Sequence, residues 1–74
     1  MTVNVFAYEW TYWDGALDEK ITRTSGYKVT RAFIEQRKKN NLLGTVYRLL
    51  EDTKETVDAA QVDPDGRYHP DWKR

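Results

Sequence analysis

Four aromatic residues recur at every second position near the start of this chain, and this feature constrains its fold most. They are Phe6, Tyr8, Trp10 and Tyr12. Successive side chains of a strand point to opposite faces, so a period of two places all four on one face. Aromatic residues also suit a pleated surface. The pattern therefore predicts a strand over about residues 3–13 with one aromatic face.

The dipeptide Asp14-Gly15 follows this pattern and favours a tight hairpin turn, because both residues tolerate positive φ. A two-residue turn there predicts a second strand over about residues 16–25, with Tyr8 opposite Ile21. Threonine, Glu and Lys then occupy the face opposite the aromatics, and apolar residues join the aromatic face. The residues that join it are Leu17 and Ile21.

A helix is predicted over residues 31–39. Thr30 is a preferred N-cap residue, and Val29 and Ile34 flank it at the spacing of a hydrophobic staple. The pair Asn40-Asn41 is expected to end the helix, since asparagine tolerates the left-handed conformation. Two apolar residues are expected to pack where the chain leaves the helix: Leu42 and Leu43.

The second half of the chain predicts one more strand, over residues 45–50, where β-branched and aromatic residues return. Residues 52–62 leave two alternatives open, a short helical turn capped by Asp52 or an extended strand. Residues 63–66 are a turn by composition. The polar residues 67–74 are expected to form a loosely ordered tail, which follows a single small domain over residues 1–66.

These elements predict a two-layer α+β domain with the order β-β-α-β. The helix must cross the sheet before it returns as the third strand, which places that strand beside the first. The expected architecture is one three-stranded antiparallel sheet with the spatial order 2-1-3, packed on one helix. The helix covers the aromatic face, so Trp10 and Phe33 are both expected to be buried between the two layers.

Composition argues against several classes of function. The 74 residues include no cysteine and one histidine, which excludes a zinc-thiolate site, and no metal or cofactor is expected. Ser25 and His69 lie in no nucleophile motif, so we do not expect an enzyme. No apolar run approaches the roughly 20 residues of a membrane helix, and a cytoplasmic location without membrane contact is expected.

Charge is unevenly distributed along the chain, although 12 basic and 12 acidic residues cancel. Residues 20–40 contain seven basic residues and one acidic residue, a net charge of +6. A possible basic surface follows, made of Arg23, Arg31, Arg37, Lys38 and Lys39. The alternative is a solvated helix face, in which the last three cations complement the helix dipole.

The aromatic residues have a second interpretation, as a base-stacking platform for RNA or single-stranded DNA. The hairpin register argues against this interpretation, because the aromatics share a face with Leu17 and Ile21. The helix must cover that face. The sequence therefore predicts that the aromatics form the core.

Residues 50–70, with the sequence LEDTKETVDAAQVDPDGRYHP, resemble the tails of some short uncharacterised bacterial proteins of unknown function. This stretch covers less than a third of the chain. The resemblance implies no activity and no site residue.

The functional expectation is a small non-enzymatic interaction domain that binds a protein partner or a second copy of itself. Two open sheet edges support this expectation, because unpaired strand edges invite β-pairing. The alternative is a nucleic-acid-binding module that uses the basic helix and the second strand. Its affinity is expected to be weak, since four or five cations supply only a modest, salt-dependent attraction to phosphates.

Overall fold

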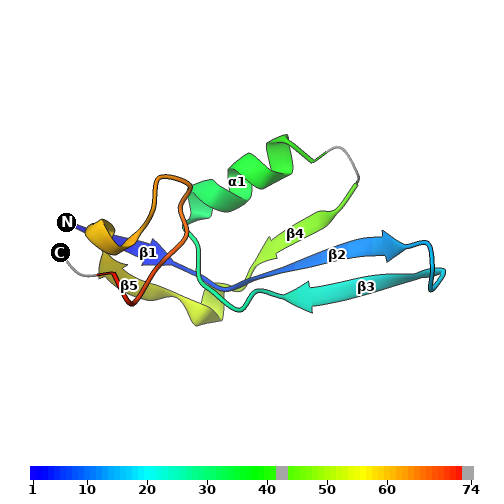
Figure 1. The fold of residues 1–74 in the computed structure, drawn as a ribbon, viewed down its shortest axis with the longest axis horizontal. Coiled ribbons are helices and arrows are strands. Elements are labelled where there is room, and N and C mark those ends of the chain that lie inside the picture. The colour runs from blue at the N-terminus through cyan, green and yellow to red at the C-terminus, as the bar shows by residue number, and fades with distance from the viewer. Residues whose placement is uncertain (42–43, 73–74) are drawn as a thin grey trace.

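A computed structural model describes residues 1–41 and 44–72 of the chain (Figure 1). Its elements in chain order are β1 (Thr2–Val5), β2 (Tyr8–Asp14), β3 (Glu19–Thr24), α1 (Arg31–Lys39), β4 (Val46–Leu49), the 3-10 helix η1 (Glu51–Thr53), β5 (Glu55–Asp58) and the 3-10 helix η2 (Ala59–Gln61). The expected α+β class, with one α-helix and antiparallel pairing in the described residues, is confirmed. The molecule is elongated, with extents of 45 × 21 × 20 Å, and the β2–β3 hairpin projects at one end.

The prediction of a single three-stranded sheet is wrong, because the strands form two sheets. One sheet has two strands, β1 and β5, and the other has three in the order β3-β2-β4. The long first strand expected over residues 3–13 is broken at Phe6 and Ala7. Phe6 exchanges two backbone hydrogen bonds of 2.8 Å with Val29, and the Ala7 N–H donates to Thr53 Oγ1 at 2.8 Å. These contacts draw the chain out of one sheet and into the other.

The hairpin between β2 and β3 has a longer turn than predicted. Tyr12 lies opposite Ile21, so the predicted pairing of Tyr8 with Ile21 is wrong by four residues. The Asp14 carboxylate accepts hydrogen bonds from the backbone N–H groups of Ala16 and Leu17, which favours a four-residue loop over the two-residue turn. The shift is even, so Ile21 stays on the aromatic face, whereas Leu17 moves into the loop and is exposed.

Helix α1 begins and ends where the sequence predicts. Its N-cap is Thr30, whose hydroxyl accepts a hydrogen bond from the Phe33 N–H at 3.3 Å. The staple residues Val29 and Ile34 are fully buried, with no exposed area. Asn40 is the C-cap without a left-handed φ. The predictions for Leu42 and Leu43 lie outside the described residues.

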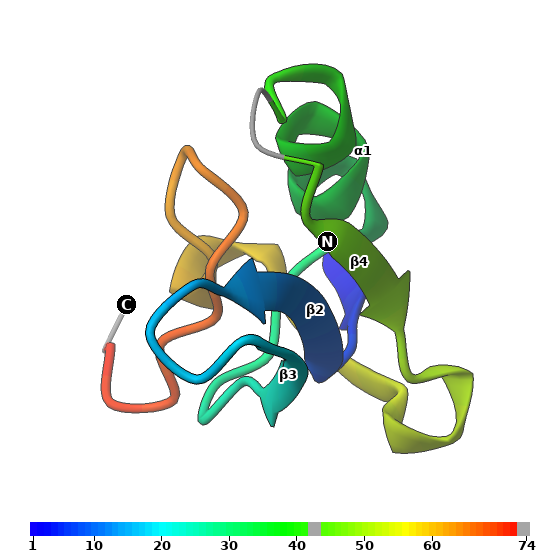
Figure 2. The same ribbon diagram turned by 90° about the vertical axis from the view of Figure 1, so that its right-hand side faces the viewer.

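The helix is too short to cover the aromatic face of the large sheet. Nine helical residues span about 13 Å at 1.5 Å per residue, whereas the seven residues of β2 span about 23 Å. Tyr8 and Phe33 are buried, as predicted for Phe33, but Trp10 is only half-buried. The prediction that Trp10 is buried is therefore wrong. Viewed end-on, α1 lies above β4, and the sheet leads away from it through β2 to β3 (Figure 2).

The third strand predicted over residues 45–50 is confirmed as β4. Residues 52–62 combine both alternatives, since the turns η1 and η2 flank the strand β5. No side chain caps η1, so the predicted cap at Asp52 is wrong. Asp58 instead caps η2 through the Ala60 N–H, at 2.9 Å.

Residues 63–66 form the predicted turn, and the segment that follows contacts the domain. The Thr30 N–H donates to the Gly66 carbonyl, and the Tyr68 N–H donates to the Lys28 carbonyl, both at 2.9 Å. The looseness expected of residues 67–74 stays a prediction, which amide hydrogen exchange measures. Within residues 1–41 and 44–72, no helix is long and apolar enough to cross a membrane.

Candidate functional site

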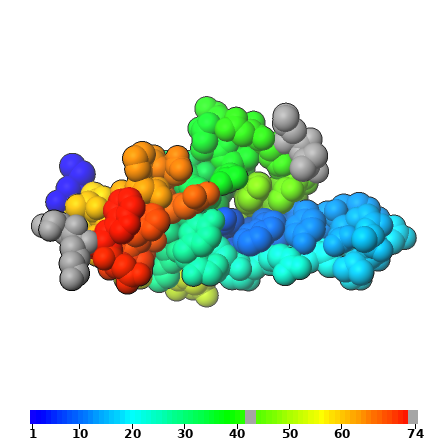
Figure 3. Space-filling model, in the orientation of Figure 1, coloured from blue at the N-terminus to red at the C-terminus, as the bar shows by residue number. Residues whose placement is uncertain are grey.

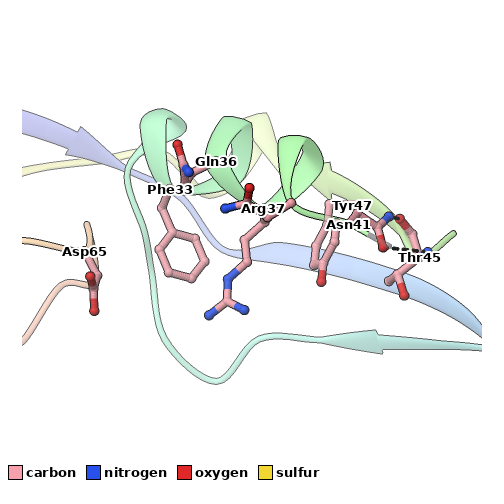
Figure 4. A pocket seen from close by; sticks show the side chains of 8 residues that line it. Phe33, Gln36, Arg37, Asn41, Thr45, Tyr47 and Asp65 are labelled. Carbon is pink, nitrogen blue, oxygen red and sulfur yellow. Dashed lines mark hydrogen bonds between the residues drawn. The ribbon is translucent and has the colours of Figure 1, made fainter. Parts of the chain in front are cut away.

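A groove of about 670 Å³ lies beside α1, where the helix faces the large sheet and the 63–66 turn. The side chains that line it are Phe33, Gln36, Arg37, Asn40, Asn41, Thr45, Tyr47 and Asp65 (Figure 4). Those from the helix and its cap follow the spacing i, i+3, i+4 and i+7, which is one helix face. In the space-filling view, the surface is hollowed between α1 and β4 (Figure 3).

Two aromatic rings form the floor of the groove, those of Phe33 and Tyr47. The buried ring of Tyr8 lies next to both, with centroid distances of 5.8 Å to Phe33, 6.3 Å to Tyr47 and 5.5 Å to Trp10. These rings come from β2, β4 and α1. Trp10 and Tyr47 are only partly buried against the core, so the floor keeps apolar surface in contact with solvent. Such surface is stabilised when another apolar group covers it.

Tyr27 connects this floor to the loop before the helix. Its hydroxyl lies 3.0 Å from the Tyr8 hydroxyl, and the two rings meet edge to face. Burial and this hydrogen bond raise the pKa of Tyr8 well above the usual value of a tyrosine. The Tyr8 hydroxyl is therefore held in its neutral form.

Two guanidinium groups flank the ring of Phe33. The Cζ of Arg37 lies 5.0 Å from the ring centroid, and the Cζ of Arg67 lies 5.6 Å from it. The Arg67 group also lies 5.9 Å from the centroid of Tyr27. Cations at these distances are attracted by the negative faces of the rings. The rings thus hold both guanidinium groups in place without a carboxylate.

The Arg67 Nε atom is buried and has no hydrogen-bond partner. Burying such a donor without a partner costs free energy. By contrast, Arg31 and Arg48 are paired, with distances of 2.7 Å to Glu51 and 3.2 Å to Glu9. Arg37 and Arg67 belong to none of the ion pairs found among the described residues. Two guanidinium groups outside those ion pairs therefore lie against a ring that lines the groove.

The far end of the groove is closed by a side-chain clamp. Asn41 donates a hydrogen bond to the Thr45 carbonyl and accepts one from the Thr45 N–H at 3.2 Å. This clamp fixes the approach to β4. The opposite end of the groove holds Asp65, an exposed carboxylate on the 63–66 turn (Figure 4).

The C-terminal segment positions Arg67 through a network centred on Asp63. Its Oδ1 accepts hydrogen bonds from the N–H groups of Asp65, Gly66 and Arg67, and its Oδ2 lies 2.8 Å from His69 Nε2. The pKa of Asp63 is lowered to about 2. The hydrogen bond with His69 is the largest cause, and the hydrogen bond from the Arg67 N–H is the next. His69 in turn stacks on Trp72, with centroids 4.2 Å apart. We name Asp63, His69 and Trp72 the C-terminal clasp.

The structure distributes the predicted basic residues over different partners. Arg37 borders the groove, and Lys38 and Lys39 are exposed on α1. Arg23 donates to the Tyr12 hydroxyl at 3.1 Å, and this contact raises its pKa. Arg31 is held by Glu51 and lies over the ring of Phe6.

Sequence reasoning missed Arg67 and Tyr27 as members of the site. Arg67 was assigned to the polar tail, and no local pattern connects it with a ring 34 positions earlier. Arg37 could have been placed more precisely, because it follows Phe33 by four residues on the predicted helix. Residues at that spacing lie next to each other on a helix surface.

The groove offers apolar and cationic contacts to a bound molecule. The Ser25 hydroxyl donates to the Tyr27 carbonyl at 2.7 Å, whereas His69 contacts Asp63, so these two residues have different partners. The described part of the chain holds no cluster of three or more His, Asp or Glu that could bind a metal. No family model, curated protein or solved structure matches this chain significantly. The functional conclusion therefore depends on the geometry of the groove alone.

Proposed function

We propose that this chain is a non-enzymatic interaction domain that binds an extended segment of a partner protein in the groove beside α1. The observation that supports this proposal is the aromatic floor of the groove, which the short helix leaves half-exposed. Apolar side chains of a bound segment would cover Tyr47, which lines the groove, and Trp10, which pairs with Tyr47 across the strands. Burial of apolar surface stabilises such a complex by roughly 25 cal/mol per Å² before the costs of association.

The walls of the groove suit a polypeptide. Gln36 and Asn40 line it with side-chain amides, which carry both donors and acceptors for the backbone of a bound segment. The groove is open, since Gln36, Arg37, Asn40 and Asp65 are all exposed. A small molecule there would keep much of its surface in water, whereas small-molecule sites bury roughly 70–90% of the ligand. An extended segment gains further contacts along the sheet.

Selection from a phage-displayed library of random peptides tests this proposal. We expect enriched sequences that bind the purified protein at about 150 mM salt. Gln36→Trp fills the groove and should weaken this binding by about tenfold or more, that is about 1.4 kcal/mol. Glu35→Trp is the matched control, since Glu35 is exposed on the same helix but does not line the groove. It should leave binding unchanged.

Two results would contradict the proposal. One is a library without any enriched sequence. The other is equal binding by the two tryptophan variants, which would place the contact outside the groove. Thermal melts of both variants establish that they are folded. Because Gln36 and Glu35 are both exposed, neither change should affect the core.

A second candidate function is binding of single-stranded nucleic acid. The observation in its favour is that Trp10, Tyr12 and Tyr47 are only half-buried on one sheet face, with Arg23 bonded to Tyr12. Partly exposed aromatics beside arginines can stack on bases. Titration with oligo-dT at about 150 mM salt separates the candidates. Submicromolar affinity that Arg37→Gln abolishes would promote this function above the first.

A further inference from the structure

The groove contains a preformed arrangement that suits one particular side chain of a bound segment. The ring of Phe33 points from α1 toward the 63–66 turn. The guanidinium groups of Arg37 and Arg67 both lie against this ring. The two arginines come from positions 30 residues apart in the chain. They meet at one ring because the Thr30 N–H donates to the Gly66 carbonyl, which fastens the turn to the start of the helix.

The charge balance around this ring is incomplete. Lys28, Arg31 and Arg48 each have a glutamate partner. Arg37 and Arg67 do not take part in those ion pairs, and the Arg67 Nε is buried without a hydrogen-bond partner. A planar guanidinium group matches a carboxylate with two parallel hydrogen bonds. A carboxylate bound by a guanidinium group beside Phe33 would balance this positive charge.

On the basis of the proposed function, we infer that the groove selects segments with an aspartate or glutamate side chain, which binds between Arg37 and Arg67 at the ring of Phe33. The rings of Phe33 and Tyr27 hold the guanidinium groups in advance, so less side-chain entropy is lost on binding. Asp65 at the end of the groove repels a second acidic residue there. The preferred segment therefore has one acidic residue at the ring and a neutral or basic residue toward Asp65.

The peptides enriched from the random library test this inference directly. We expect an aspartate or glutamate at one fixed position of the enriched sequences. Replacing that residue by its amide should weaken binding by about tenfold, and Arg37→Gln in the protein should have a similar effect. The two changes together should weaken binding little more than either change alone, because both remove the same contact.

Two variants serve as controls for charge and folding. Lys38→Gln removes the same charge from the next position of α1, and it should leave the affinity unchanged. Arg67→Lys keeps the charge of Arg67 but removes its planar fork, so it should weaken binding of the acidic peptide. A thermal melt of the Arg67→Lys variant shows whether the protein is still folded. Arg37→Gln lies on an exposed helix position, so its result stands if the Arg67 variant fails to fold.

The outcomes separate the inference from the proposed function. A library without enrichment contradicts the proposed function, and the inference falls with it. Enriched peptides without a fixed acidic position contradict only the inference. Equal losses for Arg37→Gln and Lys38→Gln also overturn it, because they would show general attraction by the basic helix. Tight oligo-dT binding that depends on Arg37 would assign the guanidinium groups to phosphates instead.

Discussion

The two ends of this molecule differ in how completely they bury their side chains. At the end formed by β1, β5 and the C-terminal clasp, Val5 and Val29 have no exposed area and Val57 has 7%. At the hairpin end, Trp13 is 59% exposed and Val46 is 64% exposed. The first end, which we name the closed end, thus holds apolar contacts that stabilise the fold. The hairpin end instead offers apolar surface to another molecule. Helix α1 lies between them (Figure 1).

The largest expected effect comes from Ile34 of α1, which packs in the core cluster with Tyr8, Val29 and Phe33. Ile34 is fully buried, and Ile34→Ala should lower the free energy of unfolding by about 2–5 kcal/mol. A domain of this size has little stability to lose. Urea denaturation measures the change. Glu35→Ala, at the exposed neighbouring position, should change it by less than about 0.5 kcal/mol. A similarly small change for Ile34→Ala would mean that this cluster does not anchor the helix.

Gly66 gives the next largest effect, because a Cβ there has neither space nor a favourable backbone. Its φ is +103°, and an added Cβ would lie 2.6 Å from the Thr30 hydroxyl. We expect Gly66→Ala to destabilise the fold by about 1–3 kcal/mol and to displace Arg67 from Phe33. Gly15→Ala in the hairpin loop is the control, since its Cβ meets no atom within 4 Å. Equal urea midpoints for the two variants would contradict this prediction.

A second contrast, between contacts of nearby residues and contacts of distant residues, explains which parts of the fold could be predicted from the sequence. The helix could be predicted because local chemistry determines both ends, with Thr30 as its cap and the Val29–Ile34 pair as its staple. The hairpin loop could not, because the Asp14 side chain competes with the turn type that Asp14-Gly15 favours. Each of these features depends on residues within a few positions of one another.

The division into two sheets depends on contacts between distant residues. The chain leaves the first strand at Ala7 because Thr53, 46 positions later, accepts its N–H. Val3 pairs with Val57 in the small sheet, and no local pattern selects that partner. The groove shares this property, because Phe33 and Arg67 meet only after the 63–66 turn docks on the helix. Arg37 was therefore predicted as a site residue, whereas Arg67 was assigned to the tail.

A pH titration tests whether the C-terminal clasp stabilises the closed end. The pKa of Asp63 is lowered from 3.8 to about 2, so its carboxylate stabilises the fold fully above about pH 4. That contribution is lost as the pH falls from about 4 to about 2. Asp63→Asn should reduce stability at neutral pH and flatten the pH dependence in this window, as measured by urea denaturation at each pH. Parallel curves for the two proteins would show that Asp63 does not make this contribution.

The smallest effect is expected at the hairpin end, from Trp13→Ser. Trp13 lies on the sheet face opposite the helix, beside Lys20 on β3, and more than half of its side chain is already in water. Its replacement should change the free energy of unfolding by less than about 0.5 kcal/mol. Trp10→Ser, on the face that packs against the core, should cost more. If Trp13→Ser instead destabilised the protein, and did so only at high protein concentration, the outer sheet face would be covered by a second copy of the chain.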